Sequence, residues 1–309
     1  MREMIVRIDV QLVAQQEVRA QEKSYTGYLV RGLVYTMLRS VDAKYAERLH
    51  SEKGSPAPFS VRPPHALVRG RVRVFEERVP ADTPFNVQIT SLDPRLTELL
   101  CRALIKRDEL VELGGARARV LSLAVKQVSS EDLRGREGVR KFAIRFLTPT
   151  FFRVHIPRAV RRAEKARVLP LPDPVHLFTN LYNVWNAYLR PEIGDDYLDW
   201  LQQHPILISR LRGVETRRYY EHPVKGVFAL GFTGTAYYAL AEDTYDEHMA
   251  KITSQLLELA ELSGVGGNRT AGFGWVEVRY PKKGSGESES TDSRPSPDAE
   301  ADLETFTLK

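Results

Sequence analysis

Cysteine is almost absent from this chain, because Cys101 is the single cysteine in 309 residues. One cysteine excludes an intramolecular disulfide and any cysteine-rich zinc module. Long apolar runs are also missing: charged residues interrupt the apolar stretches from the N-terminus onward, and none approaches the roughly 20 residues of a membrane span. We therefore expect a protein without a signal peptide or a membrane segment, located in the cytoplasm.

Several signatures of common enzymes are missing as well. The sequence has no G-x-S-x-G nucleophile motif, no H-E-x-x-H zinc motif, no P-loop and no cysteine paired with a histidine in a known pattern. The acids at 195, 196 and 199 stand at an expected helix start, where they complement the helix dipole more often than they hold a metal. The sequence thus predicts no metal site and no cofactor.

Charge is distributed unevenly along the chain. The net charge is +5, but residues 284–309 hold seven acidic and two basic side chains, which leaves +10 on residues 1–283. A basic body favours an anionic partner such as RNA. Residues 284–309 are rich in Ser and Pro and have few apolar side chains, so we predict a disordered acidic tail.

Hydrophobic periodicity predicts the order β-α-β-β-α-β in the first half of the chain. Alternation at 6–12, 67–75, 85–90 and 116–125 predicts strands, and the patterns at 27–40 and from Asp93 onward predict helices. This is the ferredoxin-like, or RRM-like, order.

The same order returns after a polar segment at 129–139. Strands are expected at 142–146, 206–216, 224–232 and 275–280, with helices from Asp173-Pro174 and from a capping box at Thr244 and Glu247. We predict an α+β protein with tandem ferredoxin-like domains: an N-terminal domain at 1–128, a linker at 129–139, a C-terminal domain at 140–283 and the tail at 284–309.

A glycine-rich loop at 263–275 separates the last expected helix from the last expected strand. Its glycines are Gly264, Gly266, Gly267, Gly272 and Gly274, and Arg269 lies among them. Glycine accepts positive φ and lets backbone N–H groups approach a ligand closely, while arginine adds a planar cationic fork. The loop therefore predicts binding of a phosphate backbone.

The loop sequence, Gly264-Val-Gly-Gly-Asn-Arg-Thr-Ala-Gly-Phe-Gly274, resembles the C-terminal signature of the CRISPR repeat-processing endoribonucleases, members of the RAMP superfamily of RNA-binding proteins. Further landmarks of that family follow the expected order over residues 140–280: Phe146-Leu-Thr-Pro-Thr150, Leu171-Pro-Asp-Pro174, Leu177-Phe178, Trp185-Asn186 and Gly231-Phe-Thr-Gly234. The resemblance implies metal-independent cleavage of CRISPR repeat RNA in precursor transcripts, leaving a 2′,3′-cyclic phosphate and a 5′-hydroxyl.

The resemblance also implies a catalytic set: His50 as general acid or base, Tyr35 as a hydroxyl donor and Lys53 as the electrostatic partner. Histidine suits proton transfer because its ordinary pKa of about 6.5 is close to neutrality. Arg31 and Arg48 are alternatives to Lys53. His155, which precedes a run of basic residues, competes with His50 for the catalytic role.

The predicted RNA contacts are the glycine loop and two further groups of cations. Arg31 and Arg39 flank Tyr35 on the first helix at i−4 and i+4. The other predicted contacts are Arg158, Arg161 and Arg162 in a basic loop, and Arg217 and Arg218 in a hairpin. The expected partner is CRISPR repeat RNA, with a CRISPR effector complex and a second copy of the chain as further candidates. The alternative function is a non-catalytic RNA-binding RAMP subunit of a CRISPR ribonucleoprotein.

Overall fold

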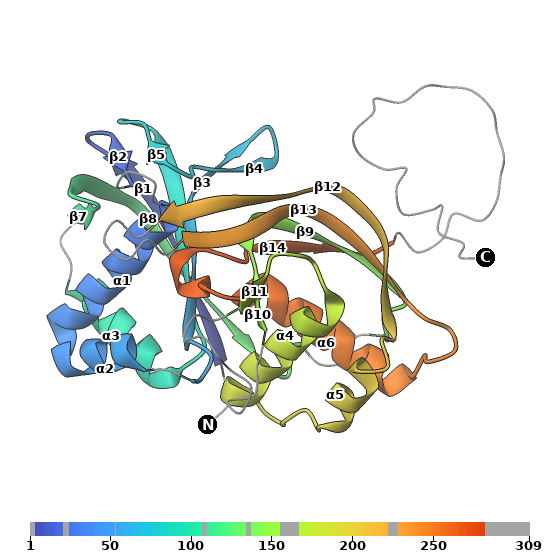
Figure 1. Ribbon diagram of the computed structural model, residues 1–309. Helices are drawn as coiled ribbons and strands as arrows, with labels where there is room; N and C mark the ends of the chain where they lie inside the picture. Colours follow the sequence, from blue (N-terminus) through green and yellow to red (C-terminus); the bar gives the residue numbers. More distant parts are fainter. Residues whose placement is uncertain are drawn as a thin grey trace.

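The computed structural model describes residues 4–20, 25–52, 54–106, 110–133, 137–154, 167–221 and 228–281. These residues form two α+β domains that lie side by side, each built on an antiparallel sheet (Figure 1). Both sheets have the strand order of the ferredoxin-like fold, so the predicted tandem architecture is confirmed. The predicted tail and residues 134–136 of the predicted linker lie outside the described residues.

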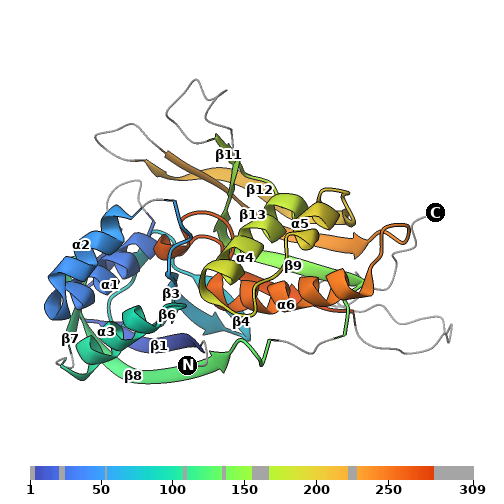
Figure 2. The same cartoon turned by 90° about the horizontal axis from the view of Figure 1, so that it is seen from below.

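The N-terminal sheet has the order β4-β3-β6-β1-β8-β7. Its strands are β1 (Met4–Ala14), β3 (Phe59–Val68), β4 (Arg71–Val74), β6 (Pro84–Ser91), β7 (Leu110–Leu113) and β8 (Ala116–Ser129). A separate two-stranded sheet pairs β2 (Val18–Arg19) with β5 (Arg78–Val79). The helices are α1 (Gly27–Val41), α2 (Ala43–Ser51) and α3 (Pro94–Ile105). The apolar sides of α1 and α3 pack on the sheet face that carries Val6, Ile8 and Val10, and α2 lies beside α1 (Figure 2).

The strand predicted at 67–75 is wrong. The structure has a hairpin there, with β3 ending at Val68 and β4 beginning at Arg71. Arg69 and Gly70 have φ of 50° and 74°, as two-residue hairpin turns of type I′ require. Val68, Val72 and Val74 keep a period of two across the turn, with Arg69, Arg71 and Arg73 between them, and this alternation hides the turn.

The C-terminal sheet has the order β12-β13-β9-β14. Its strands are β9 (Lys141–Thr150), β12 (Ile206–Glu221), β13 (Phe228–Leu240) and β14 (Val276–Arg279), and a small separate sheet pairs β10 (Phe152–Val154) with β11 (Arg167–Leu169). The helices are α4 (Pro174–Tyr188), α5 (Asp196–Leu201) and α6 (Glu247–Ser263), followed by the 3₁₀ turn η2 (Arg269–Ala271). Strands β12 and β13 are longer than the predicted hairpin arms and extend over the N-terminal domain (Figure 1).

Aspartate side chains begin four of the helices. Asp42, Asp93 and Asp173 accept hydrogen bonds from the backbone amide three residues on, at 2.9, 2.7 and 2.8 Å. The predicted start at Asp173-Pro174 is confirmed, but the predicted capping box at Thr244 is wrong. Asp246 caps α6 instead, by accepting a hydrogen bond from Met249 N at 2.9 Å.

In the described part of the chain, no helix has the length and apolarity to cross a membrane.

Each domain has its own hydrophobic core, and a third, smaller cluster lies where the domains meet. Its buried members are Tyr25, Phe151, Ala271 and Phe273. Tyr25 precedes α1, Phe151 follows β9, and the other two belong to the glycine-rich loop. The loop is thus packed between the two domains, and it places the C-terminal domain against the start of α1.

Candidate active site

Helices α1 and α2 meet at an exposed corner that contains the predicted catalytic pair. The rings of Tyr35 on α1 and His50 in the last turn of α2 are in edge contact, with centroids 5.4 Å apart. Tyr35 also contacts Phe59 at 6.1 Å, and the Arg31 guanidinium lies 5.6 Å from the Tyr35 ring centroid. Tyr35 is only 7% exposed, whereas His50 faces solvent. The structure therefore brings Tyr35, His50 and Arg31 together.

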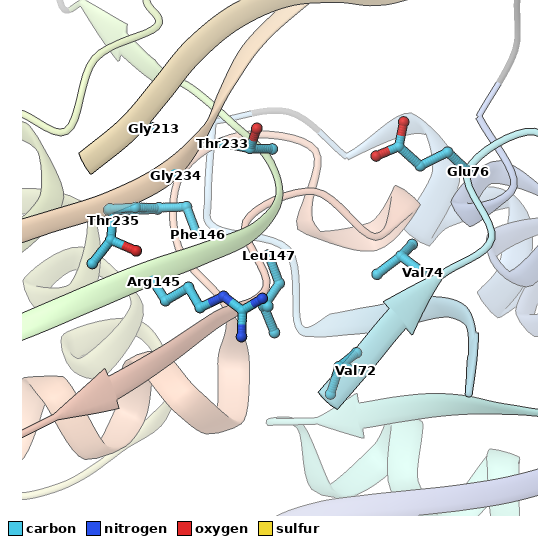
Figure 3. A pocket seen from close by; sticks show the side chains of 10 residues that line it. All are labelled: Val72, Val74, Glu76, Arg145, Phe146, Leu147, Gly213, Thr233, Gly234 and Thr235. Atoms are coloured by element: carbon cyan, nitrogen blue, oxygen red, sulfur yellow. The ribbon is translucent and has the colours of Figure 1, made fainter. Parts of the chain in front are cut away.

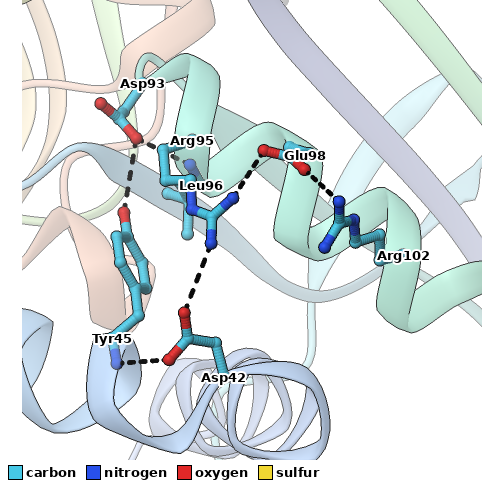
Figure 4. Close-up of polar contacts among 7 residues, drawn as sticks. All are labelled: Asp42, Tyr45, Asp93, Arg95, Leu96, Glu98 and Arg102. Atoms are coloured by element: carbon cyan, nitrogen blue, oxygen red, sulfur yellow. Dashed lines mark hydrogen bonds and ion pairs between the residues drawn. The ribbon is translucent and has the colours of Figure 1, made fainter.

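A polar network holds α2, which carries His50, against α3 (Figure 4). The Tyr45 hydroxyl donates to Asp93 at 3.4 Å, and Arg95 pairs with Asp42 at 3.4 Å. Burial, followed by the proximity of Asp93, raises the pKa of the Tyr45 hydroxyl. Because Asp42 and Asp93 also cap α2 and α3, the same carboxylates fix both helix starts and the contact between the helices.

Some predicted site residues lie outside the described residues. These are Lys53, His155, Arg158, Arg161 and Arg162. The cation that the structure does place beside the Tyr35–His50 pair is Arg31. Arg48, the other alternative to Lys53, lies over the Tyr45 ring at 5.4 Å from its centroid.

The backbone amides of the glycine loop are engaged within the protein, contrary to the prediction that they face a ligand. All five loop glycines donate a hydrogen bond from N–H to an acceptor of the chain, at 2.7–3.1 Å. In chain order the acceptors are Ala260 O, the Asn180 side-chain oxygen, Phe151 O, Arg269 O and Pro149 O. The loop is therefore a hydrogen-bonded connection between elements of the fold.

The absence of a Cβ permits close backbone contacts at Gly266 in the loop and at Gly27 in α1. A Cβ on Gly266 would overlap the carbonyl oxygen of Phe151, and one on Gly27 at the start of α1 would overlap that of Ala271 in the loop. Gly266 also has a φ of 74°. Glycine at 266 thus lets the loop backbone lie close to Phe151. Glycine at 27 lets the start of α1 lie close to Ala271 of the loop, and this second contact is between the domains.

Arg269 is buried, contrary to the prediction that it offers a cationic fork to phosphate. It is 4% exposed, and its guanidinium donates to Ser263 O and Ala57 O, each at 3.2 Å. Burial lowers the pKa of Arg269 to about 10. The prediction failed because an arginine among glycines is typical of an anion site and equally of a loop whose guanidinium donates to backbone carbonyls of the same protein.

Predicted RNA-binding cations lie on two elements, α1 and β12. Arg39 on α1 and Arg217 and Arg218 near the end of β12 are exposed, and Arg31 on α1 is partly exposed. Tyr219, next to these two arginines, contacts Tyr25 and Phe273, with ring centroids 6.4 Å away in each case. The end of β12 therefore lies beside the glycine loop and the start of α1. Predicted RNA-binding residues of the C-terminal domain thus lie next to the helix that carries those of the N-terminal domain.

A second contact between the domains was missed by sequence reasoning. Arg62 on β3 lies 4.7 Å from the Trp275 ring centroid and donates to Glu261 O at 2.7 Å. The His65 ring contacts Trp275 at 4.7 Å, and its Nδ1 is 2.8 Å from Pro63 O. Burial lowers the pKa of Arg62 to about 10 and also lowers that of His65. Alternation along 59–68 was the available signal, but Pro63-Pro64 obscured it.

A pocket of about 320 Å³ lies between β4 and the C-terminal sheet (Figure 3). The residues that line it are Val72, Val74, Glu76, Arg145, Phe146, Leu147, Gly213, Thr233, Gly234 and Thr235. Arg145 extends from β9 towards β4 and also lies 3.5 Å from the Glu277 carboxylate. With one acid and one partly neutralised cation, the lining has no excess charge that would attract phosphate.

The α1–α2 corner offers an imidazole, a phenol hydroxyl and a guanidinium next to one another. Such a set can transfer a proton near neutral pH and balance negative charge on a reacting group. Among the described residues, no group of three or more His, Cys, Asp or Glu side chains is arranged to hold a metal ion.

Comparison with known proteins agrees with this arrangement. Residues 144–276 match the family described as CRISPR-associated endoribonuclease Cas6. A Cas6 (TTHB231) product complex is similar at a TM-score of 0.70 and 23% identity, over 89% of this chain and 98% of that one. A Cas6 (TTHA0078) product complex gives 0.65 and 20%, over 89% and 99%. Thermus thermophilus Cas6 (TTHB231) gives 0.62 and 22%, over 89% and 98%.

Among curated proteins, none matches this chain. Its fold defines a protein of the tandem ferredoxin-like class, with an exposed histidine on the N-terminal domain. The match of residues 144–276 to the Cas6 family model agrees with the resemblance of the glycine-loop signature to the CRISPR repeat-processing endoribonucleases.

Proposed function

We propose that this protein cleaves CRISPR repeat RNA in precursor transcripts by metal-independent transesterification. The observation that carries the proposal is the contact between Tyr35 and the solvent-facing His50, with Arg31 beside them. The match of residues 144–276 to the CRISPR-associated endoribonuclease Cas6 family supports an endoribonuclease acting on repeats. The 2′-oxygen attacks the adjacent phosphorus, which forms a 2′,3′-cyclic phosphate and releases a 5′-hydroxyl.

Each group has a role that its chemistry permits. His50 transfers a proton, either from the 2′-hydroxyl or to the leaving 5′-oxygen. Tyr35 orients the 2′-oxygen or a phosphate oxygen through its hydroxyl, and its packed ring holds the His50 imidazole from one side. Arg31 or Lys53 balances charge on the phosphorane.

Four arginines of α1 and β12 form the proposed RNA surface. Arg31 and Arg39 contact phosphates near the cleaved bond, and Arg217 and Arg218 contact phosphates beside the glycine loop. We expect a CRISPR effector complex to receive the product, and size-exclusion chromatography at rising concentration tests for the homodimer.

The test compares His50→Ala with His248→Ala. We expect His50→Ala to slow single-turnover cleavage about 10²–10⁴-fold, the range for losing a positioned acid–base group, with nearly unchanged RNA affinity. His248, an exposed histidine in the first turn of α6 in the other domain, is the matched control, and its replacement is expected to leave the rate unchanged.

Three further measurements test the mechanism. Wild-type cleavage is expected to persist in excess EDTA, to yield a cyclic phosphate, and to stop when the scissile nucleotide has a 2′-deoxy sugar. Tight binding without defined fragments would instead indicate a non-catalytic RNA-binding subunit. Normal cleavage by His50→Ala together with loss of activity in His155→Ala would move the active site to the basic loop.

A further inference from the structure

The segment that follows His50 is held by the other domain. Between α2 and β3, the carbonyl of Pro56 accepts a hydrogen bond from the Tyr188 hydroxyl, and the carbonyl of Ala57 accepts one from Arg269 Nη2 at 3.2 Å. Tyr188 is the last residue of α4, and Arg269 belongs to the glycine loop. Two consecutive carbonyls of the N-terminal domain are therefore bound by side chains of the C-terminal domain.

The two donors form one contact. The charge of Arg269 acts on Tyr188, where it opposes the effect of burial, which raises the pKa of the Tyr188 hydroxyl to about 12. Arg269 is itself fixed, because its other terminal nitrogen donates to Ser263 O at 3.2 Å, at the end of α6. The next carbonyl, Pro58 O, accepts a hydrogen bond from Leu92 N of its own domain at 2.8 Å.

This contact is close to His50 along the chain. Pro56 lies six residues after His50, beyond the end of α2 at Ser51. On its other side His50 rests on Tyr35 of α1. Helix α2, which carries His50, is thus held by α1 and α3 within its own domain, and the segment that follows it is bound by Tyr188 and Arg269 across the domain boundary.

We propose that Tyr188 and Arg269 are positioning residues for cleavage: they set the place of His50 relative to RNA bound on the C-terminal domain. The inference rests on the proposed catalytic role of His50. It gives the glycine loop a part in catalysis that does not require its arginine to touch RNA. A shift of roughly 1 Å at a catalytic group can slow a reaction by about 10²-fold, so two hydrogen bonds in this segment can have a large effect on rate.

The first test is Tyr188→Phe, which removes the hydroxyl and keeps the ring. We expect single-turnover cleavage at saturating protein to slow by about 10-fold or more, with RNA affinity unchanged within about twofold. The matched control is Tyr182→Phe on the same helix, whose hydroxyl donates at 2.5 Å to Asp195 inside the C-terminal domain. The control is expected to cleave at the wild-type rate.

A double variant separates positioning from a general loss of structure. If Tyr188 acts through His50, the double variant His50→Ala and Tyr188→Phe cleaves no more slowly than His50→Ala alone. Arg269→Met should slow cleavage in the same way, and Arg269→Lys should recover part of the rate by donating to Ala57 O.

The outcomes can be distinguished. A wild-type rate for Tyr188→Phe, an equal loss in Tyr182→Phe, or an additive loss in the double variant would overturn the positioning role while leaving His50 as the catalytic group. A wild-type rate for His50→Ala would overturn the proposed active site, and the positioning role with it.

Discussion

Replacing Gly274 by alanine tests whether the glycines of the loop serve the protein's own packing or an RNA phosphate. Gly274 has a φ of 75°, and a Cβ at this position would overlap the carbonyl oxygen of Val265. Carbon atoms pack at roughly 3.5–4.0 Å, so the backbone must move to admit the methyl group. Gly274 takes part in two backbone hydrogen bonds, each 2.9 Å long: its amide donates to Pro149 O, and its carbonyl accepts from Val265 N.

The expected loss of stability follows from these contacts. Left-handed φ costs alanine roughly 1–2 kcal/mol. If the two hydrogen bonds are lost as the backbone moves, each adds roughly 0.5–1.5 kcal/mol. The free energy of unfolding should therefore fall by about 2–5 kcal/mol, a large part of the roughly 5–15 kcal/mol typical of a folded protein.

Urea unfolding followed by circular dichroism measures this change, with Gly32→Ala as the control. Gly32 lies on the exposed side of α1, and a Cβ there meets no atom within 4 Å. Alanine should stabilise this helix position by roughly 0.5–1 kcal/mol. Wild-type stability of Gly274→Ala combined with clearly weaker RNA binding would refute the packing argument and restore the phosphate-binding interpretation of the loop.

Three other predictions concern charge. Arg217→Ala should weaken RNA binding and lower the slope of log affinity against log salt by roughly 0.7, as expected for one single-strand phosphate contact; an unchanged slope in filter binding would exclude that contact. Truncation after Lys283 removes a net charge of −5 and should leave the thermal midpoint unchanged while RNA binding stays equal or strengthens slightly; a fall in the midpoint would show that the tail packs on the body. Burial lowers the pKa of His65 in the folded state, so the unfolded chain takes up the proton first, and stability should be lost as the pH falls below about 6.5. His65→Gln should flatten that dependence in unfolding curves between pH 7 and 5, and an unaltered curve would contradict this reasoning.

Local sequence pattern was sufficient for most of the fold. The α1 pattern at 27–40 and the Asp-Pro start of α4 were predicted to within a residue, because amphipathic period and N-cap chemistry act over a few neighbouring positions. The hairpin at Arg69-Gly70 was missed, since the alternation of valine and arginine continues across the turn and does not reveal where the chain reverses. The Tyr35–His50 pair was suggested by family resemblance, and the structure shows the two rings in contact.

The sequence by itself determined two ferredoxin-like units, a basic body and a glycine loop after the last helix. Only the tertiary structure decided what that loop does in the free protein. Positive φ at a glycine such as Gly266 suits a bound phosphate and a close-packed backbone equally well. The sequence also does not distinguish a buried arginine from an exposed one. Which acceptor an amide or a guanidinium finds depends on segments far away in the chain, as the bond from Arg269 to Ala57 shows. Hydrogen bonds between distant segments leave no local periodicity, so these partners could be identified only in the folded molecule.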